Sequence, residues 1–131
     1  MPNTFMNPAG LAAPTGYTHV VTSTGAKTIY IAGQVALDKN GKLVGSDLKT
    51  QVVQVFENLK TALAEAGATF DDVVKMTVYV VNHEEQYRAI LREVREKYVR
   101  ADRPPASTLV GVQALALRGF LVEIEAIAVV G

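Results

Sequence analysis

Hydrophobic residues recur along this chain with two different periods, one typical of helices and the other of strands. Between Asp47 and Ala66 apolar side chains return every three or four positions, which predicts one long amphipathic helix. Ser46 is expected to cap this helix, with Asp47 in its first turn, and Gly67 is expected to end it. The stripe consists of Leu48, Val52, Val55, Phe56, Leu59, Ala62, Leu63 and Ala66.

A second, shorter helix is predicted after Asn82, which is a suitable N-cap residue, with Glu84 and Glu85 in the opening turn. Its apolar stripe consists of Tyr87, Ile90, Leu91, Val94 and Tyr98. Four charged side chains of this segment are expected to face water, namely Arg88, Arg92, Arg95 and Glu96. The helical pattern ends at Arg103-Pro104-Pro105.

Strands are predicted where β-branched residues gather between turn signals. Val73–Val81 is the clearest of them. The others are His19–Ser23, Thr28–Val35, Thr108–Ala114 and Leu121–Val130, which gives about five strands.

Glycines and prolines mark the connections between these segments. The first sixteen residues hold three prolines and two glycines and are expected to form an irregular arm. Gly25-Ala26-Lys27 has the length of a hairpin connection between two strands. Asp38-Lys39-Asn40-Gly41 is a turn signal, because an Asn-Gly pair tolerates positive φ.

Two helices can cover only one face of such a sheet. In Val73–Val81 and in the last strand, however, both alternate sets of side chains are rich in apolar residues. The second face therefore needs a cover, and another copy of the chain would supply it with closed symmetry. The alternative is a monomer with a partly apolar sheet face.

Composition narrows the function classes. The chain has 131 residues, 49 % hydrophobic and 20 % charged, which fits a single folded domain over residues 1–131. Thirteen basic residues balance thirteen acidic ones, so no net charge attracts nucleic acid or an anionic membrane. The absence of cysteine excludes disulfides and thiolate chemistry, and no metal-ligand spacing is present. Because there is neither a signal-peptide pattern nor a long apolar run, we expect a cytoplasmic protein without membrane contact.

Five segments carry a family resemblance along nearly the whole chain. They are Tyr17 after the Pro-Gly arm, YIAGQV at Tyr30–Val35, AGATFDDVVKMTVYV at Ala66–Val80, RPPAS at Arg103–Ser107, and VEIEAIA at Val122–Ala128. In this order and at these spacings they resemble the RidA/YjgF family, once labelled translation inhibitors or endoribonucleases. The resemblance implies an α+β, chorismate-mutase-like fold with a mixed sheet backed by two helices. It also implies a homotrimeric barrel with ligand clefts between subunits and no cofactor.

The same resemblance implies a set of site residues. Glu123 matches the family's proposed water-activating or proton-shuttling carboxylate, and Tyr17 and Gly33 match further positions of the substrate site. Three positions depart from the family: Ser107 replaces the arginine that clamps the substrate carboxylate, Ala32 replaces a loop serine, and Leu91 replaces an asparagine. The chain therefore resembles an arginine-less subgroup, in which efficient hydrolysis of 2-imino acids is not expected.

Several assignments stay open at this point. Arg103 or Arg118 could replace the missing cation, or they could simply lie in a loop and at a hairpin tip. Glu123 could be catalytic, or it could be an interface residue paired across subunits.

Three functions are compatible with this sequence. The first is a RidA-like deaminase or hydrolase that adds water to a small imine- or enamine-like metabolite. The second is a trimeric small-molecule-binding protein without turnover. The third, ribonuclease activity, rests on old family labels alone and fits poorly with the neutral charge.

Overall fold

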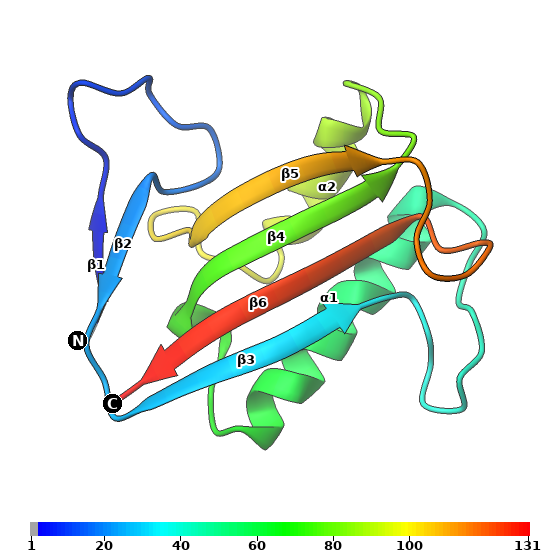
Figure 1. The fold of residues 1–131 in the computed structure, drawn as a ribbon, viewed down its shortest axis with the longest axis horizontal. Helices are drawn as coiled ribbons and strands as arrows, with labels where there is room; N and C mark the ends of the chain where they lie inside the picture. Colours follow the sequence, from blue (N-terminus) through cyan, green and yellow to red (C-terminus); the bar gives the residue numbers. More distant parts are fainter. Residues whose placement is uncertain (1–2) are drawn as a thin grey trace.

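The computed structural model describes residues 3–131, and it confirms an α+β fold with two α-helices packed against a mixed sheet (Figure 1). The elements are β1 (Asn3–Met6), β2 (Val20–Ser23), β3 (Lys27–Gln34), α1 (Leu48–Glu65), the 3-10 turn η1 (Phe70–Asp72), β4 (Val73–Val81), α2 (Tyr87–Arg95), β5 (Ala106–Val112) and β6 (Val122–Val130). Among the described residues, no helix is both long and apolar enough to cross a bilayer.

The main sheet has four strands in the order β3-β6-β4-β5. Strand β6 is antiparallel to both of its neighbours, whereas β4 and β5 run parallel. Figure 1 shows both helices behind this sheet, with α1 behind β3 and β6 and α2 behind β5. No helix in residues 3–131 covers the opposite face, which we call the open face. By strand alternation and register it carries Tyr30, Thr77, Tyr79, Glu123 and Glu125.

The N-terminal segment differs from the prediction. Part of the expected arm is strand β1, which pairs antiparallel with β2 from Asn3 opposite Ser23 to Met6 opposite Val20. The first two residues of the arm lie outside the described residues. The expected hairpin around Gly25 is wrong, because β3 pairs with β6 in the main sheet instead of with β2.

Helix α1 confirms the predicted apolar stripe, but its N-cap residue differs from the predicted one. The carboxylate of Asp47, rather than Ser46, caps the helix by accepting a hydrogen bond from the Thr50 N–H at 3.0 Å. At the other end Gly67 takes φ +78°, as expected for the residue after a helix. The stripe packs on the sheet and forms the core, in which Leu59, Leu63, Met76 and Ile124 are each at most 2 % exposed.

Helix α2 begins later than predicted. Asn82 has φ +47° and is not the N-cap; the chain turns through residues 83–86 before the helix starts at Tyr87. Only Leu91 and Val94 of its stripe are fully buried. The other ends shift by small amounts: β5 starts two residues earlier than predicted, at Ala106, and ends at Val112. Because β5 starts earlier, Ser107 lies within the strand opposite Met76 of β4.

Candidate functional site

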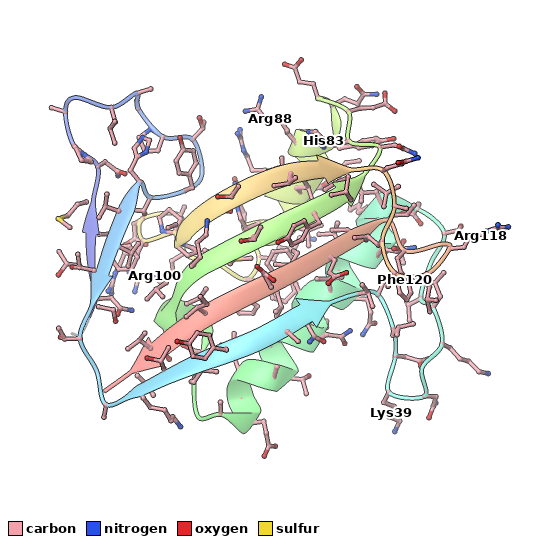
Figure 2. All side chains as sticks on the ribbon, in the orientation of Figure 1. Lys39, His83, Arg88, Arg100, Arg118 and Phe120 are labelled. Atoms are coloured by element: carbon pink, nitrogen blue, oxygen red, sulfur yellow. The ribbon has the colours of Figure 1, made fainter. Side chains whose placement is uncertain are left out.

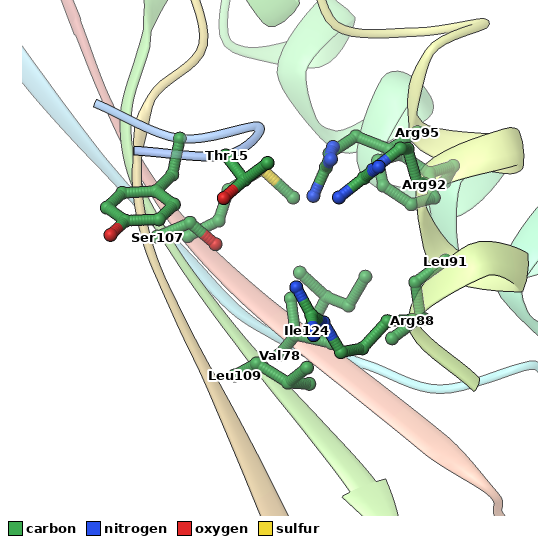
Figure 3. A pocket seen from close by; sticks show the side chains of 12 residues that line it. Thr15, Val78, Arg88, Leu91, Arg92, Arg95, Ser107, Leu109 and Ile124 are labelled. Carbon is green, nitrogen blue, oxygen red and sulfur yellow. The ribbon is translucent and has the colours of Figure 1, made fainter. Parts of the chain in front are cut away.

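A cavity of about 210 Å³ lies between α2 and the sheet (Figure 3). Its apolar wall comes from three strands and α1, through Met76, Val78, Leu109, Ile124 and Phe56. Its polar wall consists of Thr15, Tyr17 and Ser107 on one side and of residues from α2 on the other. We call it the arginine pocket, because α2 contributes Arg88, Arg92 and Arg95 besides Leu91.

The spacing of the three arginines explains their common direction. Residues four and three positions apart fall on one side of a helix, so Arg88, Arg92 and Arg95 form a stripe next to the apolar stripe. Figure 3 shows their guanidinium groups pointing into the cavity, opposite Ser107. The prediction that these side chains face water is confirmed for Arg88 and Arg92, which are exposed although they line the cavity, and it is wrong for Arg95, which is half-buried.

Arg95 is the most enclosed of the three. Its guanidinium packs against Gly16, where a built Cβ would collide with that group unless the arginine side chain shifted. Gly16 also has φ +78°, which favours glycine in its own right. Burial lowers the pKa of Arg95, and the neighbouring charge of Arg92 lowers it further. The ion pairs of residues 3–131 are Lys49–Glu93 and Arg100–Asp102, so none of the three pocket arginines has a carboxylate partner there.

Three of the predicted substrate-binding residues come together in this pocket: Tyr17, Leu91 and Ser107. Backbone contacts hold the loop of Tyr17 against the start of β5. The N–H of Thr18 donates to the carbonyl of Pro105 at 3.2 Å, and the Thr18 hydroxyl donates to the carbonyl of Pro104. Residues far apart in sequence thereby share one wall.

The other predicted residues lie elsewhere in the same chain. Ala32, Gly33 and Glu123 are not among the residues that line the arginine pocket. Glu123 precedes Ile124 in β6, and because successive side chains of a strand point to opposite faces, Glu123 belongs to the open face. Ala32 lines a shallow depression on that face together with Tyr30.

Gly33 and Glu123 form a close pair within the open face. The pairing of β3 with β6 shifts between Ile31 and Gln34, which marks a bulge at Ala32–Gly33. A Cβ built on Gly33 would overlap the Glu123 carboxylate, so glycine at this position leaves room for that group. Glu123 is half-buried, and residues 3–131 offer it no ion pair. Its neighbour Glu125 instead accepts a hydrogen bond from the Tyr79 hydroxyl at 3.3 Å.

The two arginines considered as substitutes for the missing cation lie outside the pocket. Arg103 stacks over the ring of Phe5, with its guanidinium carbon 4.9 Å from the ring centroid. Arg118 projects from the connection between β5 and β6, at the other end of the molecule from β1 and β2 (Figure 2). The described residues also contain no cluster of three or more acidic or histidine side chains that could hold a metal ion.

Sequence reasoning missed the arginines of α2. The signal was present, since Arg88, Arg92 and Arg95 follow helical spacing beside Leu91, which was itself predicted to bind substrate. A helical period places side chains around an axis, but it does not tell which side borders a cavity.

Comparisons with known proteins agree along most of the chain. The family model described as "Endoribonuclease L-PSP" matches residues 8–130. A RutC family protein of Pyrococcus abyssi is 41 % identical over 101 residues, which cover 76 % of each chain. A 2-iminobutanoate/2-iminopropanoate deaminase of Mus musculus is 40 % identical over 106 residues, which cover 80 % of this chain and 76 % of the relative.

Solved structures agree as well. YyfB of Yersinia pestis, described as a protein of unknown function of the conserved Rid family, superposes with a TM-score of 0.89 at 42 % identity; the match covers 99 % of this chain and 100 % of YyfB. RidA from the Antarctic bacterium Psychrobacter sp. PAMC 21119 superposes with a TM-score of 0.71 at 35 % identity, covering 91 % of this chain and 92 % of RidA.

Proposed function

This chain belongs to the endoribonuclease L-PSP family, also called RidA/YjgF, and from that premise we propose that it is an imine deaminase-like enzyme that adds water to a small imine- or enamine-like metabolite. The mouse relative, a deaminase of two 2-imino acids, supports the reaction type. The finer proposal is that the site is a cleft between subunits of a homotrimer, in an arginine-less subgroup of the family.

The observation that carries this proposal is the division of unpaired charge between the two faces of the sheet. The helix-covered face holds three arginines without carboxylate partners in the described chain, and the open face holds Glu123 without a cationic partner there. If one copy sets its Glu123 against the arginine pocket of another, each copy compensates the charge of the other. A cleft between two copies would then combine the predicted site residues of the arginine pocket of one copy with those of the open face of the other.

The chemistry in such a cleft is simple. Glu123 accepts a proton from a water molecule while the water oxygen bonds to the imine carbon, and Glu123 then passes this proton to the imine nitrogen. The resulting carbinolamine collapses to a carbonyl compound and releases ammonia, so one water is consumed for each ammonia formed. The open face leaves room for Glu123 to move this proton because Gly33 has no side chain there.

Simple 2-imino acids are expected to be poor substrates. Ser107 offers one neutral hydroxyl where the family clamps the carboxylate with an arginine, and a hydrogen bond to a charged group is worth about 1.5–3 kcal/mol. The cations of this pocket lie on α2, across the cavity from Ser107 (Figure 3). A molecule as short as 2-iminopropionate cannot use them in the geometry of the family clamp.

A panel of imines and enamines tests the proposal by ammonia release at matched imine flux. We expect turnover of at least one member, and hydrolysis of 2-iminopropionate indistinguishable from the uncatalysed background. Glu123→Gln should reduce the observed turnover by about 10²–10⁴-fold, the usual contribution of a general base. Unchanged turnover in Glu123→Gln would remove this residue from the mechanism.

Assembly is tested separately by sedimentation at micromolar concentration. A specific interface buries more than about 1,000 Å². The open face offers a surface for such an interface, because its large aromatic side chain Tyr30 is 78 % exposed in the single chain. We expect a trimer. A monomer at this concentration would contradict the shared cleft.

A second candidate is a small-molecule-binding protein without turnover. It is favoured by the fact that Glu123 does not line the arginine pocket of its own chain. Ligand binding without ammonia release across the whole panel, with wild-type trimers, would select this function over the first.

A further inference from the structure

The arginine pocket concentrates positive charge far beyond the average of this chain. Thirteen basic residues balance thirteen acidic ones overall, yet Arg88, Arg92 and Arg95 line one cavity of about 210 Å³. Arg118, in contrast, is exposed outside the pocket, and Arg100 is paired with Asp102 at 2.9 Å. The charge in the pocket is therefore not a general property of the surface.

The three guanidinium groups form no ion pair within residues 3–131, and the carboxylate that acts on Arg95, that of Glu96, lies beyond ion-pair distance. Like charges at this helical spacing destabilise the helix. Arg95 is half-buried, with its guanidinium against Gly16. A cluster that carries such a cost without a partner is best compensated by an anion in the cavity, which the planar forks of arginine bind well.

The wall opposite the arginines sets the type of anion. Ser107 and Thr15 supply hydroxyl groups, while Met76, Val78, Leu109 and Ile124 form an apolar floor. Even if Glu123 of a second copy enters the cleft, as the proposed function requires, one carboxylate neutralises only one of the three positive charges. Two positive charges remain for the ligand.

We propose that the arginine pocket binds the doubly charged anionic part of a small metabolite, either a phosphate monoester or a dicarboxylate, with Arg88 and Arg92 as its main contacts and Arg95 behind them. The helix-borne arginines then select substrates with more negative charge than a simple 2-imino acid. This inference deepens the proposed function and rests on it for the shared cleft, but the binding itself can be measured without turnover.

Calorimetric titrations of the full-length protein with inorganic phosphate, succinate and acetate, at constant ionic strength, test the inference. Phosphate or succinate should bind at least about tenfold more tightly than acetate, because the dianions contact two guanidinium groups. Tighter binding of phosphate than of succinate would indicate a phosphate monoester as the ligand, and tighter binding of succinate would indicate a dicarboxylate. Equal affinity for acetate and both dianions, or no saturable binding, would overturn the inference.

Variants locate the binding. Arg88→Gln and Arg92→Gln should each weaken the preferred dianion by about 10- to 100-fold, the loss of one charge-assisted hydrogen bond. Both side chains are exposed and each substitution relieves repulsion between like charges, so the temperature of thermal unfolding should not fall. Arg118→Gln is the matched control, with the same change of charge outside the pocket, and should keep wild-type affinity. An equal loss in all three variants would mean that only net charge matters and would refute the site.

Glu123→Gln separates this inference from the proposed function. We expect it to abolish turnover and to retain dianion binding. If the wild type and all variants bind the dianion but none shows turnover, the dianion site is supported and the proposed enzymatic function is contradicted. If the wild type shows turnover but no preference for dianions, the enzymatic function is supported and the dianion site is contradicted.

Discussion

The two helices lie on the same face of the sheet but use their polar residues differently. Helix α1 buries seven residues, and one of them, Gln51, is fully hydrogen-bonded to backbone groups. Helix α2 buries only Leu91 and Val94, and its arginines point into a cavity without a partner in the described chain. Polar groups satisfied within the chain indicate structure, and polar groups left unsatisfied indicate a ligand or a partner. On this basis we expect α1 to contribute mainly to the fold and α2 to the candidate site.

The largest expected effect on the free energy of unfolding comes from truncating one apolar residue in each helix, which compares how much α1 and α2 contribute to the fold. Leu59 of α1 is 1 % exposed, and Leu59→Ala should lower the free energy of unfolding by about 2–5 kcal/mol. Leu91→Ala should cost no more than the lower end of that range, because Leu91 already borders a cavity. Urea denaturation of both variants measures the two values. An equal or larger loss for Leu91→Ala would mean that α2 carries as much of the fold as α1.

Gln51 tests the polar side of the comparison. Its amide donates to the carbonyls of Gly45 at 3.1 Å and Gly119 at 2.9 Å, and its oxygen accepts from the Leu121 N–H at 2.9 Å. Gln51→Leu keeps a similar size but leaves these backbone groups unpaired, which should cost about 1–3 kcal/mol. The matched variant Arg92→Gln in α2 should not lower stability, because Arg92 is exposed and its charge repels those of its neighbours. Similar denaturation midpoints for wild type and Gln51→Leu would contradict the structural role of this residue.

The smallest effect is expected at the ion pair that joins the two helices. Lys49 of α1 and Glu93 of α2 are 3.2 Å apart, with side chains 50 % and 54 % exposed. Glu93→Gln should change the free energy of unfolding by less than about 1 kcal/mol, since exposed pairs are screened by solvent. A larger loss of unfolding free energy would show that the ion pair holds α2 in position against α1. In that case high salt, which screens the pair, should lower the unfolding free energy of the wild type by a similar amount.

The same comparison explains what the sequence could and could not predict. The stripe of α1 was recovered because burial imposes a helical period on it, and the strand Val73–Val81 was recovered because it is rich in β-branched residues. The hairpin near Gly25 failed because local turn signals do not tell which strand becomes a partner. The N-caps shifted because Asp47 and Ser46 are both good capping residues, and only the hydrogen bond to Thr50 distinguishes them.

The site was predicted in part for a related reason. Tyr17, Leu91 and Ser107 meet in one pocket as the family resemblance implied. The arginine side chains of α2 were predicted to face solvent, and no cavity beside them was predicted, because a charged residue next to an apolar stripe usually is solvated. Their long side chains reach back over the cavity, and this depends on how α2 packs against β5, a tertiary feature that no local pattern contains.

Subunit complementation tests the central claim, that the site is assembled from two copies of this chain, most directly. Glu123→Gln removes the carboxylate of the open face, and Ser107→Phe fills the arginine pocket, so each variant alone should be inactive on the best imine of the panel. If the cleft is shared, random exchange in an equal mixture restores about a quarter of all clefts, those that join an intact pocket to an intact Glu123 of another copy. We predict this recovery after subunit exchange. No recovery, with exchange verified by mass spectrometry, would place the whole site within one chain and contradict the account.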